Sequence, residues 1–230
     1  PLTIKILNEL YWILGDMTFC ERAAMLANVC SPENRNIRMM KRLAEINLVK
    51  GDYDAARKYL RILQKTFVWS RWANRAFDAL GRKASSYDKA LLQQYLDKRP
   101  YLNTRDTLRL NDNCHTILSE LMESNPNNNI AVNYMLCSDL LLKDMETFKH
   151  DYDAYYLKQQ NVAYEKLYQE ALAIYLAGTK VPPAEWAKYI KRQDVLQRFK
   201  LYNEQRGNPA FKDTYWYYFD KAEAPKLNNN

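Results

Sequence analysis

The sequence predicts an all-α protein in which antiparallel helix pairs repeat and stack into an α-α superhelix. Hydrophobic residues make up 47% of the chain and charged residues 27%, which is typical of a folded globular protein. Only five glycines and eight prolines are present, and this favours helices joined by short connections over a barrel or sandwich. A turn motif recurs at Gly15, Gly51 and Ser85, at intervals of 36 and 34 residues. Helical repeats have periods of about 34 residues.

The clearest repeat unit surrounds Gly51. Apolar residues between Leu43 and Leu48 fall on one face of a first helix, and Gly51 supplies the left-handed backbone that ends it. Asp52 can cap the second helix, and Ala56 is small where the two helices must approach closely. This pattern resembles the tetratricopeptide repeat, whose second helix commonly opens on Gly-Asp-Tyr with an alanine five residues after the glycine.

The same motif occurs on both sides of this unit. Upstream it reads Gly15-Asp16-Met17, with Cys20 at the position of the small alanine. Downstream it reads Ser85-Ser86-Tyr87-Asp88. We therefore expect regular tetratricopeptide-like repeats over about residues 1–100, within a helical repeat domain that extends to residue 207.

From about residue 101 to residue 207 the pattern predicts degenerate repeats. A helix from Ile130 to Leu142 is followed by Lys143-Asp144-Met145, which echoes the first turn without its glycine. A further helix is expected from about Val162 to Leu176, and Pro182-Pro183 is expected to open a last long helix that reaches Gly207.

An aromatic segment, residues 208–219, follows the last predicted helix. Tyr215 to Phe219 are five consecutive aromatic residues, which would form an adhesive patch if exposed. We expect this segment to dock over the end of the last helix pair, and packing against a part of the protein outside this chain is the alternative. The tail up to Asn230 is polar and is expected to be frayed.

Three stretches carry a wider resemblance: Asn47 to Tyr53, Leu196 to Asn203, and Thr214 to Phe219. They resemble the C-terminal soluble region of an uncharacterised bacterial family in which a multi-spanning membrane region precedes a tetratricopeptide-like domain. The resemblance implies a membrane-tethered soluble domain of the cell envelope, with the periplasmic side favoured, and it implies no activity. The chain contains no run of about 18 apolar residues and opens on Pro1, as expected of a fragment.

The sequence contains no convincing catalytic, metal or cofactor motif. His115 and His150 are its only histidines, and the adjacent Cys114 and His115 would diverge by about 100° on a helix. Neither a phosphate-binding glycine loop nor a nucleophile elbow is present. We therefore expect no enzyme, no metal and no cofactor, and we expect the four cysteines to be buried free thiols.

The candidate site is a groove that a partner would occupy. In tetratricopeptide domains the first helix of each unit lines the concave face, and the resemblance places on that face Lys5, Glu9, Trp12, Arg38, Lys41, Arg42 and Glu45. Cationic side chains on such a face can hold a partner's carboxylate. Glu9 and Glu45 stand where that clamp would carry a neutral amide, so they can instead pair with neighbouring cations. A mixed-charge, solvated groove is the simpler alternative.

Three functions are compatible with these features. The first is a non-catalytic scaffold that binds a protein or peptide through the concave groove. The second is an accessory substrate-binding domain of an envelope enzyme whose catalytic part lies upstream. The third is single-stranded nucleic-acid binding by basic and aromatic residues between Lys65 and Lys83, which the modest net charge of +7 disfavours. No oligomeric state follows from the sequence.

Overall fold

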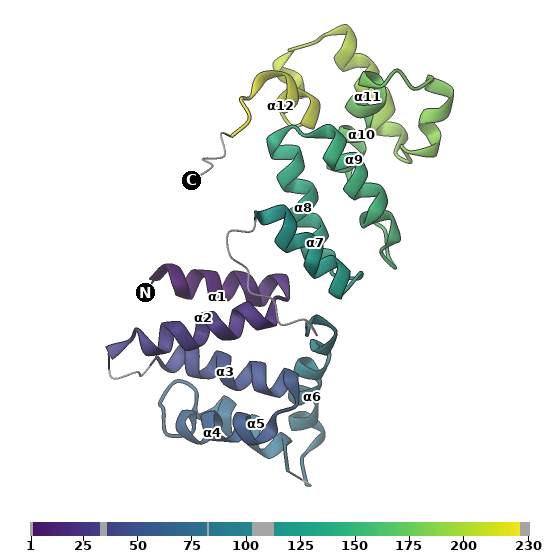
Figure 1. The fold of residues 1–230 in the computed structure, drawn as a ribbon. Helices are drawn as coiled ribbons and strands as arrows, with labels where there is room; N and C mark the ends of the chain where they lie inside the picture. The colour runs from purple at the N-terminus through teal and green to yellow at the C-terminus, as the bar shows by residue number, and fades with distance from the viewer. Residues whose placement is uncertain (1, 33–35, 82, 103–112, 226–230) are drawn as a thin grey trace. The chain divides into compact units, whose positions relative to one another are not determined.

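The computed structural model of the chain describes residues 2–32, 36–81, 83–102 and 113–225. These residues form helices joined by turns and include no β-strand (Figure 1). Their contacts divide the chain into two compact units, Pro1–Ala131 and Val132–Asn230. The all-α prediction is confirmed, and the helices pack in neighbouring pairs.

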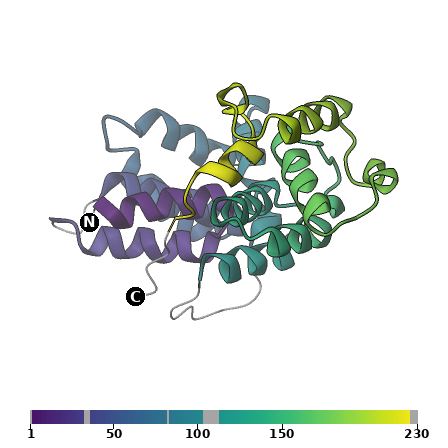
Figure 2. The ribbon, with the colours of Figure 1, turned by 90° about the horizontal axis from the view of Figure 1, so that it is seen from above.

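The helices of the first unit form successive hairpins. Each helix contacts the next along the chain from α1 to α6, and α3 also contacts α6. In the view of Figure 2, α1 and α2 lie side by side along their length. The elements are α1 (Leu2–Leu14), α2 (Met17–Val29), α3 (Ile37–Lys50), α4 (Tyr53–Leu63), α5 (Ser70–Ala79), α6 (Ser86–Leu96), the 3₁₀ turn η2 (Arg99–Tyr101) and α7 (Cys114–Ser124).

The three turns have the local structure that their sequences predict. Gly15 and Gly51 have φ angles of +84° and +79°, a left-handed conformation that costs glycine little. The side chains of Asp16 and Asp52 accept hydrogen bonds from backbone N–H groups three residues on, at 3.1 and 3.0 Å. Ser85 caps α6 in the same way, at 3.1 Å. In each of the hairpins α1–α2, α3–α4 and α5–α6, the motif is therefore the turn that joins the two helices.

Small residues let the helices of this unit approach closely. Cys20 and Ala56 occupy the small position of the motif, and both are 0% exposed. Trp72 and other aromatic residues after α4 pack against the core of α3 and α4, as expected for a seam between hairpins. Phe67 is fully exposed and is the exception.

The second unit begins within α8 and ends in the C-terminal segment. Its elements are α8 (Asn129–Leu142), α9 (Met145–Ala154), the 3₁₀ turn η3 (Tyr156–Lys158), α10 (Lys166–Gly178), η4 (Pro183–Lys188), α11 (Gln193–Glu204), η5 (Pro209–Phe211) and α12 (Tyr215–Lys221). Lys143 joins α8 to α9 with a φ of 59°, so a lysine takes the left-handed position that glycine holds in the first unit. Asp144 then caps α9 with a 3.0 Å bond to the N–H of Thr147.

The prediction of a single long helix from Pro182 to Gly207 is wrong. Residues 183–188 form the 3₁₀ segment η4, and α11 begins only at Gln193. Between them the side chain of buried Gln169 accepts a 2.6 Å hydrogen bond from the backbone N–H of Lys191. That N–H group is therefore satisfied outside a helix, and Ile190 beside it is 1% exposed.

The aromatic segment packs onto α10 and α11. Trp216 is 1% exposed, and its ring lies 5.2 Å from that of Phe199 and 5.9 Å from that of Tyr202. The backbone N–H of Tyr215 donates to Glu170 of α10 at 2.7 Å. The end of the tail, residues 226–230, lies outside the described residues. None of the described helices has both the length and the apolar character needed to cross a membrane.

Candidate partner-binding groove

The predicted groove residues gather on one face of the first unit. Arg38, Lys41, Arg42 and Glu45 are spaced so that they share one side of α3, and α1 places Glu9 beside them. A hollow of about 200 Å³ is lined by Glu9, Arg38, Lys41, Arg42, Glu45 and Trp69. We call this hollow the groove, and these six residues are its lining.

Two predicted residues lie outside the lining. Trp12 of α1 faces the guanidinium of Arg42, which stands 4.2 Å from the ring centroid. Such stacking fixes the plane of an arginine and directs its N–H groups. Lys5, near the start of α1, is half-buried and does not line the groove.

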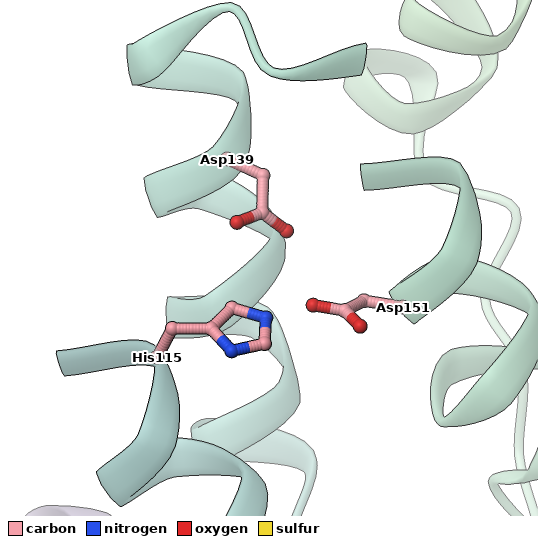
Figure 3. A group of neighbouring side chains, drawn as sticks. All are labelled: His115, Asp139 and Asp151. Carbon is pink, nitrogen blue, oxygen red and sulfur yellow. The ribbon is translucent and has the colours of Figure 1, made fainter. Parts of the chain in front are cut away.

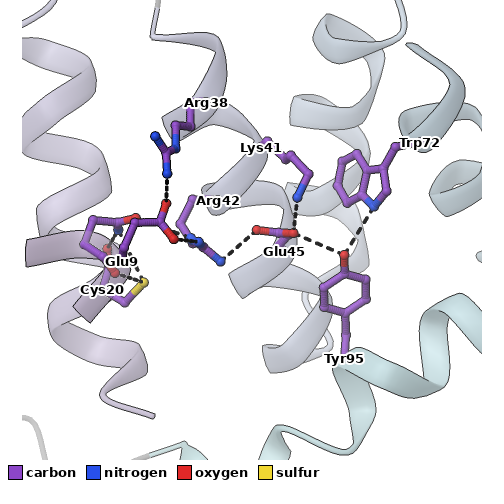
Figure 4. A network of polar contacts seen from close by, with 9 residues as sticks. Glu9, Cys20, Arg38, Lys41, Arg42, Glu45, Trp72 and Tyr95 are labelled. Carbon is purple, nitrogen blue, oxygen red and sulfur yellow. Dashed lines mark hydrogen bonds and ion pairs between the residues drawn. The ribbon is translucent and has the colours of Figure 1, made fainter. Parts of the chain in front are cut away.

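Both acidic residues of the groove are paired with cations (Figure 4). Glu9 accepts hydrogen bonds from Arg38 at 3.0 Å and from Arg42 at 2.6 Å. Glu45 accepts from Lys41 and, at 3.0 Å, from Arg42. The sequence analysis gave ion pairing of these two acids with neighbouring cations as an alternative to a carboxylate clamp. The structure shows these ion pairs.

Glu45 has a third donor from a distant helix. The hydroxyl of Tyr95 in α6 donates to Glu45 at 3.2 Å, and the indole N–H of Trp72 donates to that hydroxyl at 3.2 Å. Burial and the negative charge of Glu45 raise the pKa of Tyr95, so the hydroxyl keeps its proton. Glu45 is only 6% exposed, and its charge is compensated by three donors.

The thiol of Cys20 lies next to this cluster and is unreactive at neutral pH. Asn8 accepts a hydrogen bond from Arg42 at 3.3 Å and donates to the carbonyl of Cys20 at 2.6 Å. Burial raises the pKa of the Cys20 thiol to about 12, so the nucleophilic thiolate is scarce at neutral pH. Nucleophilic chemistry by Cys20 has no support in this geometry.

Positive charge outnumbers negative charge around the groove. Among the described residues at and beside it there are four cations, Arg38, Lys41, Arg42 and Lys98, and two carboxylates, Glu9 and Glu45. The ammonium of Lys41 lies 4.8 and 4.7 Å from the ring centroids of Trp69 and Trp72. The ammonium of Lys98 lies 4.9 Å from the ring of Trp12, and burial lowers its pKa. A groove of this kind can bind an anion beside an apolar group.

The sequence did not identify Tyr95 or Lys98 as part of this cluster. Tyr95 is 50 residues from Glu45, and no spacing rule links the two positions. Trp69 and Trp72 belong to the basic and aromatic stretch between Lys65 and Lys83, and both pack against the core of α3 and α4. Their second role, facing Lys41, depends on the approach of α5 to α3.

The second unit has a separate acidic pair. Asp139 of α8 and Asp151 of α9 are 4% and 1% exposed, and their carboxylate groups point toward each other, with oxygens within 4.8 Å (Figure 3). Both side chains also have other partners. Two carboxylates alone do not define a metal centre, so we assign no ion to them.

The cysteines differ from one another in exposure. All four are free thiols, and the expectation of burial holds for Cys20. It is wrong for Cys30 and Cys114, which are exposed, while Cys137 is intermediate. Cys30 directly follows α2, and Cys114 opens α7, so both stand at helix ends rather than on packed faces.

Comparison with known proteins gives a family but no activity. No curated protein and no solved structure matches the chain. The family model that matches residues 1–222 is described as a family of unknown function, DUF6057. This agrees with the resemblance to an uncharacterised family, while the tetratricopeptide-like character and the membrane context stay predictions. Because the match covers nearly the whole chain, this protein belongs to the DUF6057 family.

Proposed function

We propose that the first unit is a non-catalytic scaffold that binds a protein or peptide partner through the groove. In this proposal Arg38 and Lys41 hold an acidic group of the partner, and Trp69 packs against the partner's neighbouring apolar atoms. The observation that carries the proposal is the excess of cations around the groove together with the exposure of Arg38, whose side chain is 62% exposed.

The helix order supports a peptide-binding face. The groove residues come from α1 and α3, the first helices of two hairpins, and from Trp69, the residue that precedes the first helix of the third. This is the arrangement expected if the three hairpins form a tetratricopeptide-like superhelix. The recurrence of Gly15, Gly51 and Ser85 at nearly constant intervals favours that arrangement.

The existing ion pairs leave the groove able to accept a partner. The Arg38–Glu9 pair is substantially exposed, and such pairs contribute only about 0–1 kcal/mol. A partner carboxylate can therefore replace Glu9 on Arg38 at small cost. The side chains of Arg42 and Glu45 are only 10% and 8% exposed, and we assign Glu45 the role of holding Lys41 and Arg42 in position.

A peptide display library provides a direct test. Random peptides selected on the purified chain should be enriched in Asp and Glu or in free C-terminal carboxylates. The variant Arg38→Gln/Lys41→Gln should weaken binding of the selected peptides at least about tenfold, because two charge-assisted bonds are lost. The control Lys58→Gln/Lys89→Gln removes the same charge from exposed positions on α4 and α6 and should bind normally. Circular dichroism checks that every variant is folded.

Three results would count against this function. One is a selection that enriches no peptide, and another is selected peptides that bind the Arg38→Gln/Lys41→Gln variant as tightly as the parent chain. A third is tight, steeply salt-dependent binding of single-stranded oligonucleotides in place of peptides, which would favour the nucleic-acid alternative.

A further inference from the structure

A cavity of about 660 Å³ opens in the second unit, away from the acidic pair of α8 and α9. It lies between α8, α10 and the C-terminal segment, and it is the size of cavities that hold small organic ligands, about 300–1,000 Å³. Its wall includes Leu141, Lys166, Leu167, Glu170 and Lys212.

Most of the wall is apolar. Leu141 and Leu167, which line the cavity, are 53% and 40% exposed and so present apolar surface to it. The hydroxyl groups of Tyr215 and Tyr218 donate to the carbonyls of Leu140 and Leu141 at 2.8 and 2.9 Å. Since both phenol groups have protein partners, these rings contribute mainly apolar surface to the cavity.

Two ammonium groups stand in the polar part of the wall. The Nζ atom of Lys166 is 3.6 Å from Glu170 Oε1 and 3.6 Å from Asp213 Oδ2, distances that are too long for direct hydrogen bonds. Lys212 is exposed, and among the described residues its side-chain ammonium has no hydrogen-bond or ion-pair partner. Both lysines can therefore donate to a bound anion.

The two carboxylates beside them are held by other groups. Asp213 is bound by both terminal nitrogens of Arg198, one of them at 2.7 Å. Glu170 accepts the N–H of Tyr215 at 2.7 Å through Oε2. Neither acid therefore neutralises both lysines, and Arg198 adds a further positive charge nearby.

Glu170 is a buried acid in the polar part of the cavity wall. The residue is 2% exposed, yet its Oε1 atom has no hydrogen bond from any residue that the structure describes. A buried oxygen without a donor costs free energy. A protonated Glu170 would remove this cost by donating from that oxygen to a bound carboxylate. Burial also raises the pKa of Glu170, which eases its protonation and reduces its repulsion of an anion.

We propose that this cavity binds a long-chain carboxylate, with the aliphatic chain against Leu141 and Leu167 and the carboxylate on Lys166 and Lys212. Charge complementarity selects the anionic head, and the apolar wall selects the chain. The proposal concerns the second unit alone and does not depend on the function proposed for the first.

Calorimetric titration of the full chain with dodecanoate, below its micelle concentration, tests the proposal. We expect saturable binding, with an affinity at least threefold higher than for dodecyltrimethylammonium, which has the same chain and the opposite charge. The variant Lys166→Gln/Lys212→Gln should weaken dodecanoate binding about threefold to tenfold, as expected for partly exposed ion pairs. Leu167→Trp should obstruct both ligands. The control Lys200→Gln removes one lysine charge at an exposed position of α11, outside the cavity, and should bind dodecanoate normally.

Alkylation locates the bound ligand. Cys137 lines the cavity, whereas Cys30 is exposed in the other unit. Dodecanoate should slow the reaction of Cys137 with iodoacetamide and leave that of Cys30 unchanged, as followed by peptide mass spectrometry. Absence of saturable dodecanoate binding, equal affinity for the two amphiphiles, or unprotected Cys137 at saturation would each overturn the proposal.

Discussion

Replacing Glu45 by glutamine removes one negative charge from the centre of the groove cluster and keeps the shape of the side chain. Glu45 is 6% exposed and receives hydrogen bonds from Lys41, Arg42 and Tyr95. Glutamine retains one carbonyl oxygen as an acceptor. Its NH₂ group would then face at least one of the present donors, so a buried donor loses its partner.

The expected cost follows from these partners. Breaking a buried ion pair by changing one partner costs about 3–5 kcal/mol. Two features reduce that figure here: Arg42 keeps its bond to Glu9, and Lys41 keeps its contacts with two tryptophan rings. We therefore expect Glu45→Gln to lower the free energy of unfolding of the first unit by about 2–3 kcal/mol.

Urea denaturation followed by circular dichroism and tryptophan fluorescence measures this loss. The matched control is Asp54→Asn, which also removes one carboxylate charge from an ion pair. Asp54 pairs with Arg57 at 3.0 Å, but its side chain is 91% exposed. The control should change the free energy of unfolding by less than about 0.5 kcal/mol.

The losses of unfolding free energy in the two variants test whether the buried cluster stabilises the first unit. If Glu45→Gln costs no more than Asp54→Asn, the buried cluster stabilises the unit no better than a surface ion pair. If Glu45→Gln raises stability, desolvation of the charges outweighs their mutual attraction. Either result would refute the assignment of Glu45 as the residue that holds the groove cations in place.

Three further predictions concern local features. Gly51→Val should cost at least about 1 kcal/mol in thermal or urea unfolding, because φ is +79°, whereas Gly178→Ala meets no atom within 4 Å and should be tolerated. Iodoacetamide should alkylate exposed Cys30 at pH 8 and spare buried Cys20, whose pKa is raised to about 12, until the chain unfolds. Asp213→Asn should destabilise the second unit at neutral pH. An arginine lowers the pKa of Asp213 to about 2, so its ionised form stabilises the fold above the ordinary carboxyl pKa and the effect disappears as pH falls through about 2.

Local sequence was sufficient for the turns and for most of the groove. Gly15 and Gly51 take positive φ angles, and Asp16 and Asp52 cap the helices that follow. These features depend on residues within one helical turn of each other, so a short motif contains all the information. The residues of α3 from Arg38 to Glu45 were grouped through the resemblance to tetratricopeptide domains, and their helical spacing is what puts them on one face.

The contacts between residues far apart in the sequence could be found only from the tertiary structure. Tyr95 reaches Glu45 from 50 residues away, and Gln169 interrupts an expected helix by binding the N–H of Lys191. The cavity beside Glu170 exists because the C-terminal segment turns back onto α10. Each of these features depends on which helices approach one another and at what distance. Periodicity determines which face of a helix is buried, but not which distant side chain that face will contact.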